Sequence, residues 1–255
     1  MLPLMHFEIF AKGNSLLHKL DPRAKVLSAF VCAITFALLQ TLFSSLLALV
    51  FGVGLVVLGR FPLRPLLQRL LVINIFVFFL WLVLPFSYNT GAVLFSLGPF
   101  TARAPGLDLA LLITVKSNAI VLSTLSLLGS MPMFALVRAL QALHVPNKLV
   151  QILFFSLRYF QLMHGEYERL RASMAARAFK PGTNLHTYRS YAWLLSMLFA
   201  RSLDRAERVY EAMLCRGYRG KLHSLQTTTC QGRDLAFLGV TLLICVVSAS
   251  LSLKA

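Results

Sequence analysis

The sequence predicts an all-α, polytopic membrane protein with five, or six, transmembrane helices and long amphipathic helices on the cytoplasmic side. Of the 255 residues, 58% are hydrophobic and only 13% are charged, a composition far more apolar than that of a soluble domain. Five segments approach the roughly 20 apolar residues that a membrane span requires. Between the fourth and the fifth segment, a basic stretch carries helical periodicity almost throughout. These three observations define the fold class.

Four predicted spans lie in an N-terminal membrane region, residues 1–128. The second of them is short, so its ends are open. A middle region, residues 129–233, separates these spans from a C-terminal region, residues 234–255, which contains the last span. The five predicted spans are residues 26–42, 46–58, 66–86, 107–128 and 235–253.

The basic residues predict the orientation of the chain. Lys and Arg are enriched in cytoplasmic loops, and Lys19 and Arg23 precede the first span, whereas Arg64 lies between the second and third spans. The middle region holds 15 of the 25 basic residues. We therefore expect a cytoplasmic N-terminus. The net charge of +16 then belongs to a cytoplasmic region and indicates no nucleic-acid partner.

The middle region reads as helices and contains no low-complexity linker. Pro132 and Pro146 fit early helical positions, and the helix that follows Pro146 is expected to stop at Lys180-Pro181-Gly182. A further segment repeats the trend, apolar first and then amphipathic. Its uncharged part, residues 190–200, is too short to span a bilayer, so it is placed at the membrane face or among the spans. A sixth span is the alternative.

The ends of these two long segments form an internal repeat with an offset of 39 residues. The same pattern occurs twice without a gap. It begins with Glu-Arg and an apolar residue, continues with a Met, and ends with an Arg, a small residue and an aromatic residue. The first copy has its Met at 174 and its Arg at 177, and the second copy has them at 213 and 216. A frame of this length is unlikely to arise twice by chance.

Each repeated Arg falls on the apolar stripe of its helix. At 100° per residue, Arg216 lies within about 20° of Val209, and Arg177 stands in the same relation to Leu170. A guanidinium there needs a partner that accepts its hydrogen bonds, such as a carboxylate or the carbonyls of another helix end. The alternative is that each Arg caps its own helix, which stabilises by about 0.3–1 kcal/mol. The repetition favours a docking device.

The two Arg-centred motifs resemble the paired Ala-Arg-Gly signatures of the transmembrane T component of energy-coupling factor (ECF) transporters. The segments LDPRAKVL, VPNKLVQILFFSLRY and ERVYEAMLCRGYRG are also similar to its cobalt-type, CbiQ-like branch. Ala178 replaces the first Gly of the signatures, and Cys215 replaces the second Ala. The matching positions are Ala176, Arg177, Ala178, Cys215, Arg216 and Gly217.

The resemblance implies a scaffold without its own substrate site. The two helix ends would dock onto two cytoplasmic ABC ATPases, which bind ATP and Mg²⁺, while a CbiM-like substrate-binding S component, with a small CbiN-like subunit, would bind Co²⁺ or Ni²⁺. A vitamin S component is the alternative. The expected location is the cytoplasmic membrane of a bacterium or archaeon.

The chain is not expected to be an enzyme or to bind a metal or cofactor itself. It contains no P-loop, GxSxG or HExxH motif. The six His and four Cys residues are scattered without a spacing typical of metal sites or disulfides. A membrane-embedded enzyme is disfavoured because the spans carry few acids and bases.

One cation falls inside a predicted span. Lys116 lies near the middle of the fourth span, where an insertion scale assigns a cost of about 2.5–3.5 kcal/mol. It either contacts Asn118 or Asn74 inside the bundle or snorkels from a span that begins later. A stand-alone channel or secondary transporter, the remaining class, would need more polar centres at this depth.

Overall fold

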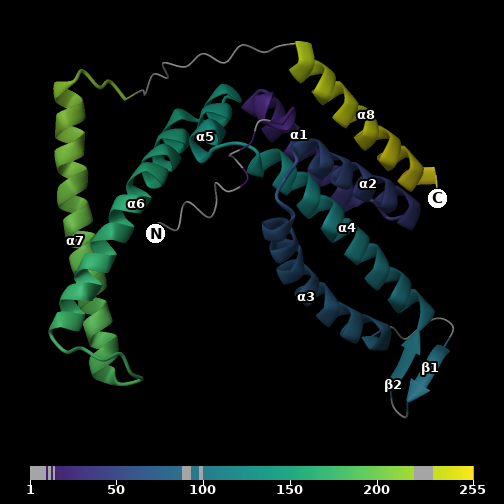
Figure 1. Ribbon diagram of the computed structural model, residues 1–255, viewed down its shortest axis with the longest axis horizontal. Helices are drawn as coiled ribbons and strands as arrows, with labels where there is room; N and C mark the ends of the chain where they lie inside the picture. The colour runs from purple at the N-terminus through teal and green to yellow at the C-terminus, as the bar shows by residue number, and fades with distance from the viewer. Residues whose placement is uncertain are drawn as a thin grey trace. The chain divides into compact units, whose positions relative to one another are not determined.

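The computed structural model describes Phe10, Gly13 and residues 15–87, 93–97, 100–220 and 232–254. These residues are overwhelmingly helical (Figure 1). The first four long helices are α1 (Pro22–Leu38), α2 (Leu42–Gly59), α3 (Leu63–Ser87) and α4 (Ala104–Gly129), preceded by the short helix η2 (Leu17–Lys19). They are followed by α5 (Met133–Ala142), α6 (Asn147–Ala176), α7 (Leu185–Cys215) and α8 (Gly232–Lys254).

The predicted all-α, polytopic membrane fold is confirmed. Four helices are long and apolar enough to cross a membrane: α2, α3, α4 and α8. The short second span becomes a complete helix of 18 residues. The first predicted span, residues 26–42, corresponds to α1, which has 17 residues and ends at Leu38. Leu42, which was expected to close this span, begins α2.

The segment between α3 and α4 is described only in part. Its backbone forms an antiparallel pair of strands, β1 (Val93–Leu97) and β2 (Phe100–Arg103), in which Leu97 is paired with Phe100. This hairpin was not expected from the sequence, although short antiparallel strands are compatible with a turn rich in Gly and Pro.

The chain divides into two compact units. Among the described residues, one unit lies within 5–139 and 228–255, and the other lies within 140–227. The first unit therefore carries α1 to α4 and α8, and the second carries α6 and α7. The three regions expected from the sequence, residues 1–128, 129–233 and 234–255, stay a prediction.

Small residues bring α2 and α4 close together in the first unit. Ala48 of α2 and Ala119 of α4 are fully buried. A Cβ atom on Gly52 would lie 3.2 Å from the Ala119 carbonyl oxygen and 3.2 Å from Ser123 Oγ. Helices in membranes associate through this kind of close approach because lipid offers no hydrophobic driving force between them.

Helices α1 and α8 run parallel, with one sequence offset of 213 residues along their contact. Ser28 Oγ lies 3.3 Å from Thr241 Oγ1, and Cys32 Sγ lies 3.7 Å from Cys245 Sγ. The two thiols are free and buried. Because the helices are parallel, α8 starts on the side of the unit where α1 starts.

Charged residues are buried where α1 and α8 begin. Asp21 is the N-cap of α1, because its Oδ1 accepts the N–H of Arg23 at 2.9 Å. The N–H of Asp21 in turn donates to Asp234 Oδ1 at 2.9 Å. Lys25 is only 1% exposed and faces the charge of both carboxylates. An isolated buried charge is costly, so Lys25 and the carboxylates of Asp21 and Asp234 are stable only while they stay together. These three residues therefore hold the starts of α1 and α8 together.

The α2–α4 contact predicts unequal effects of two glycine substitutions in the same helix. Gly52→Leu should destabilise the protein by about 1–3 kcal/mol, because backbone and side-chain atoms of α4 leave no room for the new side chain. Gly54→Leu is the matched control, since nothing lies within 4 Å of a Cβ at that position. Thermal unfolding in detergent measures both, and equal melting temperatures would contradict the packing described for α2.

Candidate functional site

Helices α6 and α7 form an antiparallel hairpin whose two arms touch at three levels. Near the loop, the ring of Phe179 meets Tyr191 edge to face at 5.9 Å. In the middle, Arg201 of α7 binds Glu166 of α6. At the open end, Tyr218 Oη donates to Gln151 Oε1 at 2.9 Å. Residues that start α6 therefore lie beside residues that follow α7.

The contact in the middle is a buried carboxylate among arginines. Glu166 is 4% exposed, and Oε2 accepts from Arg169 Nη1 at 3.2 Å while Oε1 accepts from Arg201. The hydrogen bond from Arg201 holds the pKa of the Glu166 carboxyl below its ordinary value, against the opposing effect of burial. The charges of Arg201, Arg169 and Arg205 lower this pKa further. The carboxylate thus stays ionised and joins the two helices.

The two repeated helix ends adopt one backbone motif. At the end of α6, Phe179 N–H donates to the Met174 carbonyl at 3.1 Å, and Ala178 N–H donates to the Ala175 carbonyl at 3.0 Å. At the end of α7, Tyr218 N–H donates to the Met213 carbonyl at 3.0 Å, in the same pattern. This pair of bonds is a Schellman motif.

The residue after each Arg has a left-handed backbone. Ala178 has φ 59° and Gly217 has φ 81°. The replacement of Gly by Ala in the first motif therefore leaves its geometry unchanged. A Cβ in this region costs about 1–2 kcal/mol, so the first helix end is the more strained of the two.

The aromatic residue at the end of each motif ties its helix end to the other arm of the hairpin. Phe179 contacts the α7 side through His186, at 6.3 Å between ring centroids, as well as through Tyr191. Tyr218 contacts α6 through Gln151, whose Nε2 also donates to the Gly220 carbonyl at 2.7 Å. Phe179 and Tyr218, which occupy equivalent positions of the repeat, thus both anchor a helix end to the opposite arm.

Both repeated arginines are exposed C-cap residues, Arg177 of α6 and Arg216 of α7. Backbone N–H groups already bind two carbonyls at each helix end, those of Met174 and Ala175 in α6 and those of Met213 and Leu214 in α7, so these carbonyls need no guanidinium. Among the described residues, neither Arg forms a salt bridge within 4.0 Å. The 31 residues of α7 separate the two ends by about 45 Å at 1.5 Å per residue.

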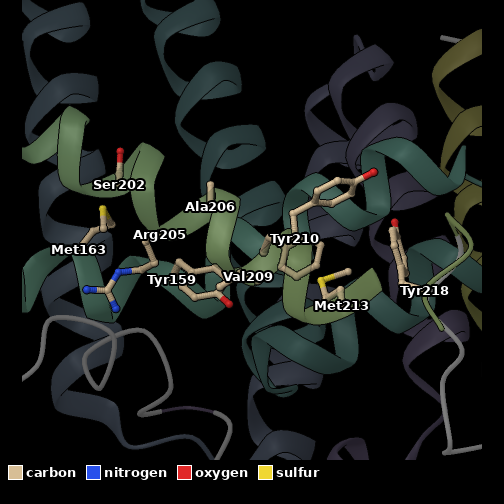
Figure 2. A pocket seen from close by; sticks show the side chains of 10 residues that line it. Tyr159, Met163, Ser202, Arg205, Ala206, Val209, Tyr210, Met213 and Tyr218 are labelled. Atoms are coloured by element: carbon tan, nitrogen blue, oxygen red, sulfur yellow. The ribbon is translucent and has the colours of Figure 1, made fainter. Parts of the chain in front are cut away.

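A largely apolar groove of about 500 Å³ runs between the two arms (Figure 2). Tyr159 and Met163 of α6 line one wall, and Val209 and Met213 of α7 line the other. Tyr218 closes the end next to the second Arg motif. The apolar lining of this groove suits the packing of apolar side chains.

The polar residues predicted inside the membrane region divide into two contacts. Asn74 Nδ2 donates to Asn118 Oδ1 at 3.1 Å, and Asn118 Nδ2 donates back to Asn74 Oδ1 at 3.0 Å. Lys116 Nζ donates instead to the Ala37 carbonyl at 3.2 Å, in the last turn of α1. This carbonyl has no partner within its own helix, so Lys116 caps α1. A functional role for the three residues stays a prediction.

Metal binding has little support in the described part of the chain. No group of three or more His, Cys, Asp or Glu side chains gathers there in a way that could hold a metal ion. His6, His223 and Cys230 lie outside the described residues. The prediction that this chain binds neither metal nor cofactor stays a prediction.

Sequence reasoning identified the two Arg motifs but missed the residues that position them. Glu166 carries no motif, and its partner Arg201 lies 35 residues away. One signal was present, because the aromatic position after each Arg belongs to the repeat. Its function became visible only when the opposite helix was in place.

The left-handed position after each Arg predicts opposite effects of two substitutions. Ala178→Gly should stabilise the end of α6 by about 1 kcal/mol, because Gly adopts this backbone without strain. Gly217→Ala should destabilise the end of α7 by a similar amount. Amide hydrogen exchange in the last turn of each helix reports both changes. Slower exchange in Gly217→Ala, or faster exchange in Ala178→Gly, would contradict the assigned motif.

The lowered pKa of Glu166 predicts a pH-dependent hairpin. The contribution of its carboxylate to stability is complete above the unfolded pKa of about 4.3 and is lost as the pH falls through the lower folded pKa. Glu166→Gln should therefore lower the melting temperature at pH 7, and the difference from wild type should shrink below about pH 4.

Glu168→Gln is the control for this prediction. Its carboxylate is half exposed and lies 3.9 Å from Arg171, a contact that contributes little. A constant difference between Glu166→Gln and wild type from pH 7 to pH 3 would show that the ion pair is not the cause.

The comparisons place this chain among transport proteins. Residues 13–228 match the CbiQ family, which is described as cobalt transport protein. Among curated relatives, the energy-coupling factor transporter transmembrane protein EcfT of Streptococcus equi subsp. equi (strain 4047) is 30% identical over 229 residues, covering 83% of this chain and 82% of the relative. EcfT of Bacillus subtilis (strain 168) is 28% identical over 230 residues, covering 86% and 87%. EcfT of Ruminiclostridium cellulolyticum is 26% identical over 221 residues, covering 83% and 82%.

The family match extends over α1 to α4 and over both Arg motifs, and α8 lies beyond its last residue. A family match of this extent agrees with the apolar helices of the first unit and with the paired helix ends of the second. The chain belongs to the CbiQ family, the transmembrane T components of energy-coupling factor transporters.

Proposed function

We propose that this T component links two cytoplasmic ABC ATPases to a substrate-binding S component, with Arg177 and Arg216 as the docking residues. Each helix end, Ala176-Arg177-Ala178 or Cys215-Arg216-Gly217, docks onto one ATPase. ATP and Mg²⁺ bind to the ATPases, and this chain is a non-catalytic subunit. Closure of the ATPases on ATP moves the two helix ends, and the hairpin passes this movement to the S component.

The observation that carries this proposal is the identical geometry of two helix ends at opposite ends of one hairpin. Both are Schellman motifs with an exposed C-cap Arg, and in both motifs backbone N–H groups bind the same two carbonyls of the last turn. A separation of about 45 Å is too large for one compact site. Two similar ends at this separation fit two similar partners, one at each end.

The groove between α6 and α7 supports the same function. Its apolar wall ends at Tyr218, the residue that follows the second motif. A partner seated on Arg216 would therefore sit next to a surface that connects both arms of the hairpin. Movement at one end would reach the other arm through packed side chains.

The cargo that we propose is Co²⁺, with Ni²⁺ as its closest chemical relative. The description of the matching family supports a metal ion. The metal site would belong to a CbiM-like S component, with a small CbiN-like subunit. A vitamin S component is the alternative, because the names of the curated relatives specify no cargo.

We place the chain in the cytoplasmic membrane of a bacterium or archaeon, with its N-terminus in the cytoplasm. Two basic side chains support this orientation, Arg60 between α2 and α3 and Arg64 in the first turn of α3. The parallel arrangement of α1 and α8 puts the starts of both helices on one side of the first unit. The hairpin would then face the ATPases.

The docking proposal predicts the loss of the ATPases on charge reversal. Arg177→Glu combined with Arg216→Glu should reduce the ATPase that co-purifies with this chain from its native membrane by at least about ten-fold. Each buried charge contact of this kind contributes more than the 1.4 kcal/mol that changes an affinity ten-fold. Quantitative immunoblotting of the purified complex measures the loss.

Arg171→Glu combined with Arg208→Glu is the matched control. These exposed arginines lie on the same two helices, and their reversal changes the net charge by the same amount. The control should retain the ATPase. Equal retention by both double variants, or equal loss, would sink the assignment of Arg177 and Arg216.

A further inference from the structure

A second cavity of about 590 Å³, the α6-end cavity, lies near the loop of the hairpin, between the last turns of α6 and the first half of α7. Three positions of the repeat line both this cavity and the groove of Figure 2: an aliphatic residue, a Met and an aromatic residue. They are Leu170, Met174 and Phe179 in the α6-end cavity and Val209, Met213 and Tyr218 in the groove. Each Arg motif thus stands next to a cavity with an equivalent wall.

This equivalent wall is open to a partner in both copies of the repeat. All six of its side chains are half-buried. Met174 and Met213 lie at its centre, and the unbranched, polarizable side chain of Met adapts readily to an apolar side chain of another protein. Both helix ends can therefore receive an apolar side chain of a partner in the same way.

The walls opposite these positions differ. In the groove, the opposite wall is aromatic, because the rings of Phe155 and Tyr159 of α6 stack there at 6.2 Å between centroids. Arg205, the one charged residue among the described residues that line the groove, acts on the buried carboxylate between the arms. In the α6-end cavity, the opposite wall contains the polar side chains of His186 and Ser190 of α7. The α6-end cavity is thus the more polar of the two.

The α6-end cavity also carries positive charge. Arg177, Lys180 and Arg201 line it, and none of the described residues that line it is an Asp or a Glu. Arg201 is paired with Glu166, whereas neither Arg177 nor Lys180 forms a salt bridge within 4.0 Å in the described part of the chain. Arg219 occupies the position of Lys180 in the second copy of the repeat but does not line the groove. A carboxylate is therefore complementary to the α6-end cavity.

We propose that each ATPase inserts one apolar side chain between the two arms of the hairpin, and that the ATPase at the α6 end also places a carboxylate on Lys180. The apolar side chain packs against Met174 in the α6-end cavity and against Met213 in the groove. The carboxylate distinguishes the two ends, since the groove offers packing in its place. This inference rests on the proposed function, because it takes the ATPases as the partners of both helix ends.

Photo-crosslinking in native membranes measures the two helix ends of the full chain separately. A photo-reactive amino acid replaces either Ala172 or Glu211, exposed residues at equivalent positions of the repeat. The ATPase in each cross-linked product is identified by mass spectrometry. The yield from Ala172 then reports the occupancy of the α6 end, and the yield from Glu211 reports that of the α7 end.

Two substitutions that fill the cavities serve as controls for each other. Ser190→Phe fills the α6-end cavity and should lower the yield from Ala172 about ten-fold, as the loss of one anchor residue does, while the yield from Glu211 is unchanged. Ala206→Phe fills the groove and should have the reverse effect. The yield that persists at the other end shows that each variant has folded.

A second pair of variants tests the charge. Lys180→Gln should lower the yield from Ala172 about three-fold, a value typical of a partly exposed ion pair. Arg219→Gln removes the same charge at the equivalent position of the repeat and should leave the yield from Glu211 unchanged, because Arg219 lies outside the groove.

The outcomes separate this inference from the proposed function. If wild type joins the ATPases at both ends but neither filling substitution lowers its own yield, or each lowers both yields equally, the inserted side chain is refuted. Equal effects of Lys180→Gln and Arg219→Gln would refute the carboxylate. If both positions capture only the S component or lipid, the proposed function itself fails.

Discussion

The arrangement of the second unit depends on one buried carboxylate. Glu166 is enclosed between α6 and α7 and accepts hydrogen bonds from Arg201 of the opposite arm and Arg169 of its own. Removing one partner from such a contact leaves a buried charge uncompensated, which makes the crossing point hard to shift. With this point fixed, the antiparallel arms must place the end of α6 beside the start of α7 and the end of α7 beside the start of α6. The two Arg motifs consequently lie at opposite ends of the hairpin.

A different constraint governs the first unit. Helices within a bilayer gain little from burying apolar surface against each other, so close backbone contact and polar pairs determine which helices associate. Gly52 allows α2 to approach α4, the paired amides of Asn74 and Asn118 join α3 to α4, and Asp234 joins α8 to the start of α1. Lys116 of α4 is another such polar contact, because it donates a hydrogen bond to the Ala37 carbonyl in the last turn of α1. The bundle is therefore a scaffold specified by a few polar and small residues in a mostly apolar sequence.

Hydropathy and periodicity predicted much of this architecture. The apolar runs identified the membrane helices, and the repeat located both Arg motifs. The contacts between distant segments could not be predicted in this way. Asp21 and Asp234 are separated by 213 residues, and nothing in either local pattern indicates that they meet. Glu166 looks like any charged residue of an amphipathic helix until Arg201 is placed against it. Local sequence determines where a helix ends, whereas the register between two helices depends on the folded chain.

The central claim is that each end of one hairpin contacts its own ATPase. It is tested most directly by a photo-crosslinking amino acid at Ala172 and at Glu211, exposed positions of the repeat five residues before each Arg, so both motifs stay intact. In native membranes, either position alone should join the chain to one ATPase. Both positions together should produce a covalent species of one chain with two ATPases. A doubly labelled chain that never carries more than one ATPase, or an end that joins none, would contradict this account.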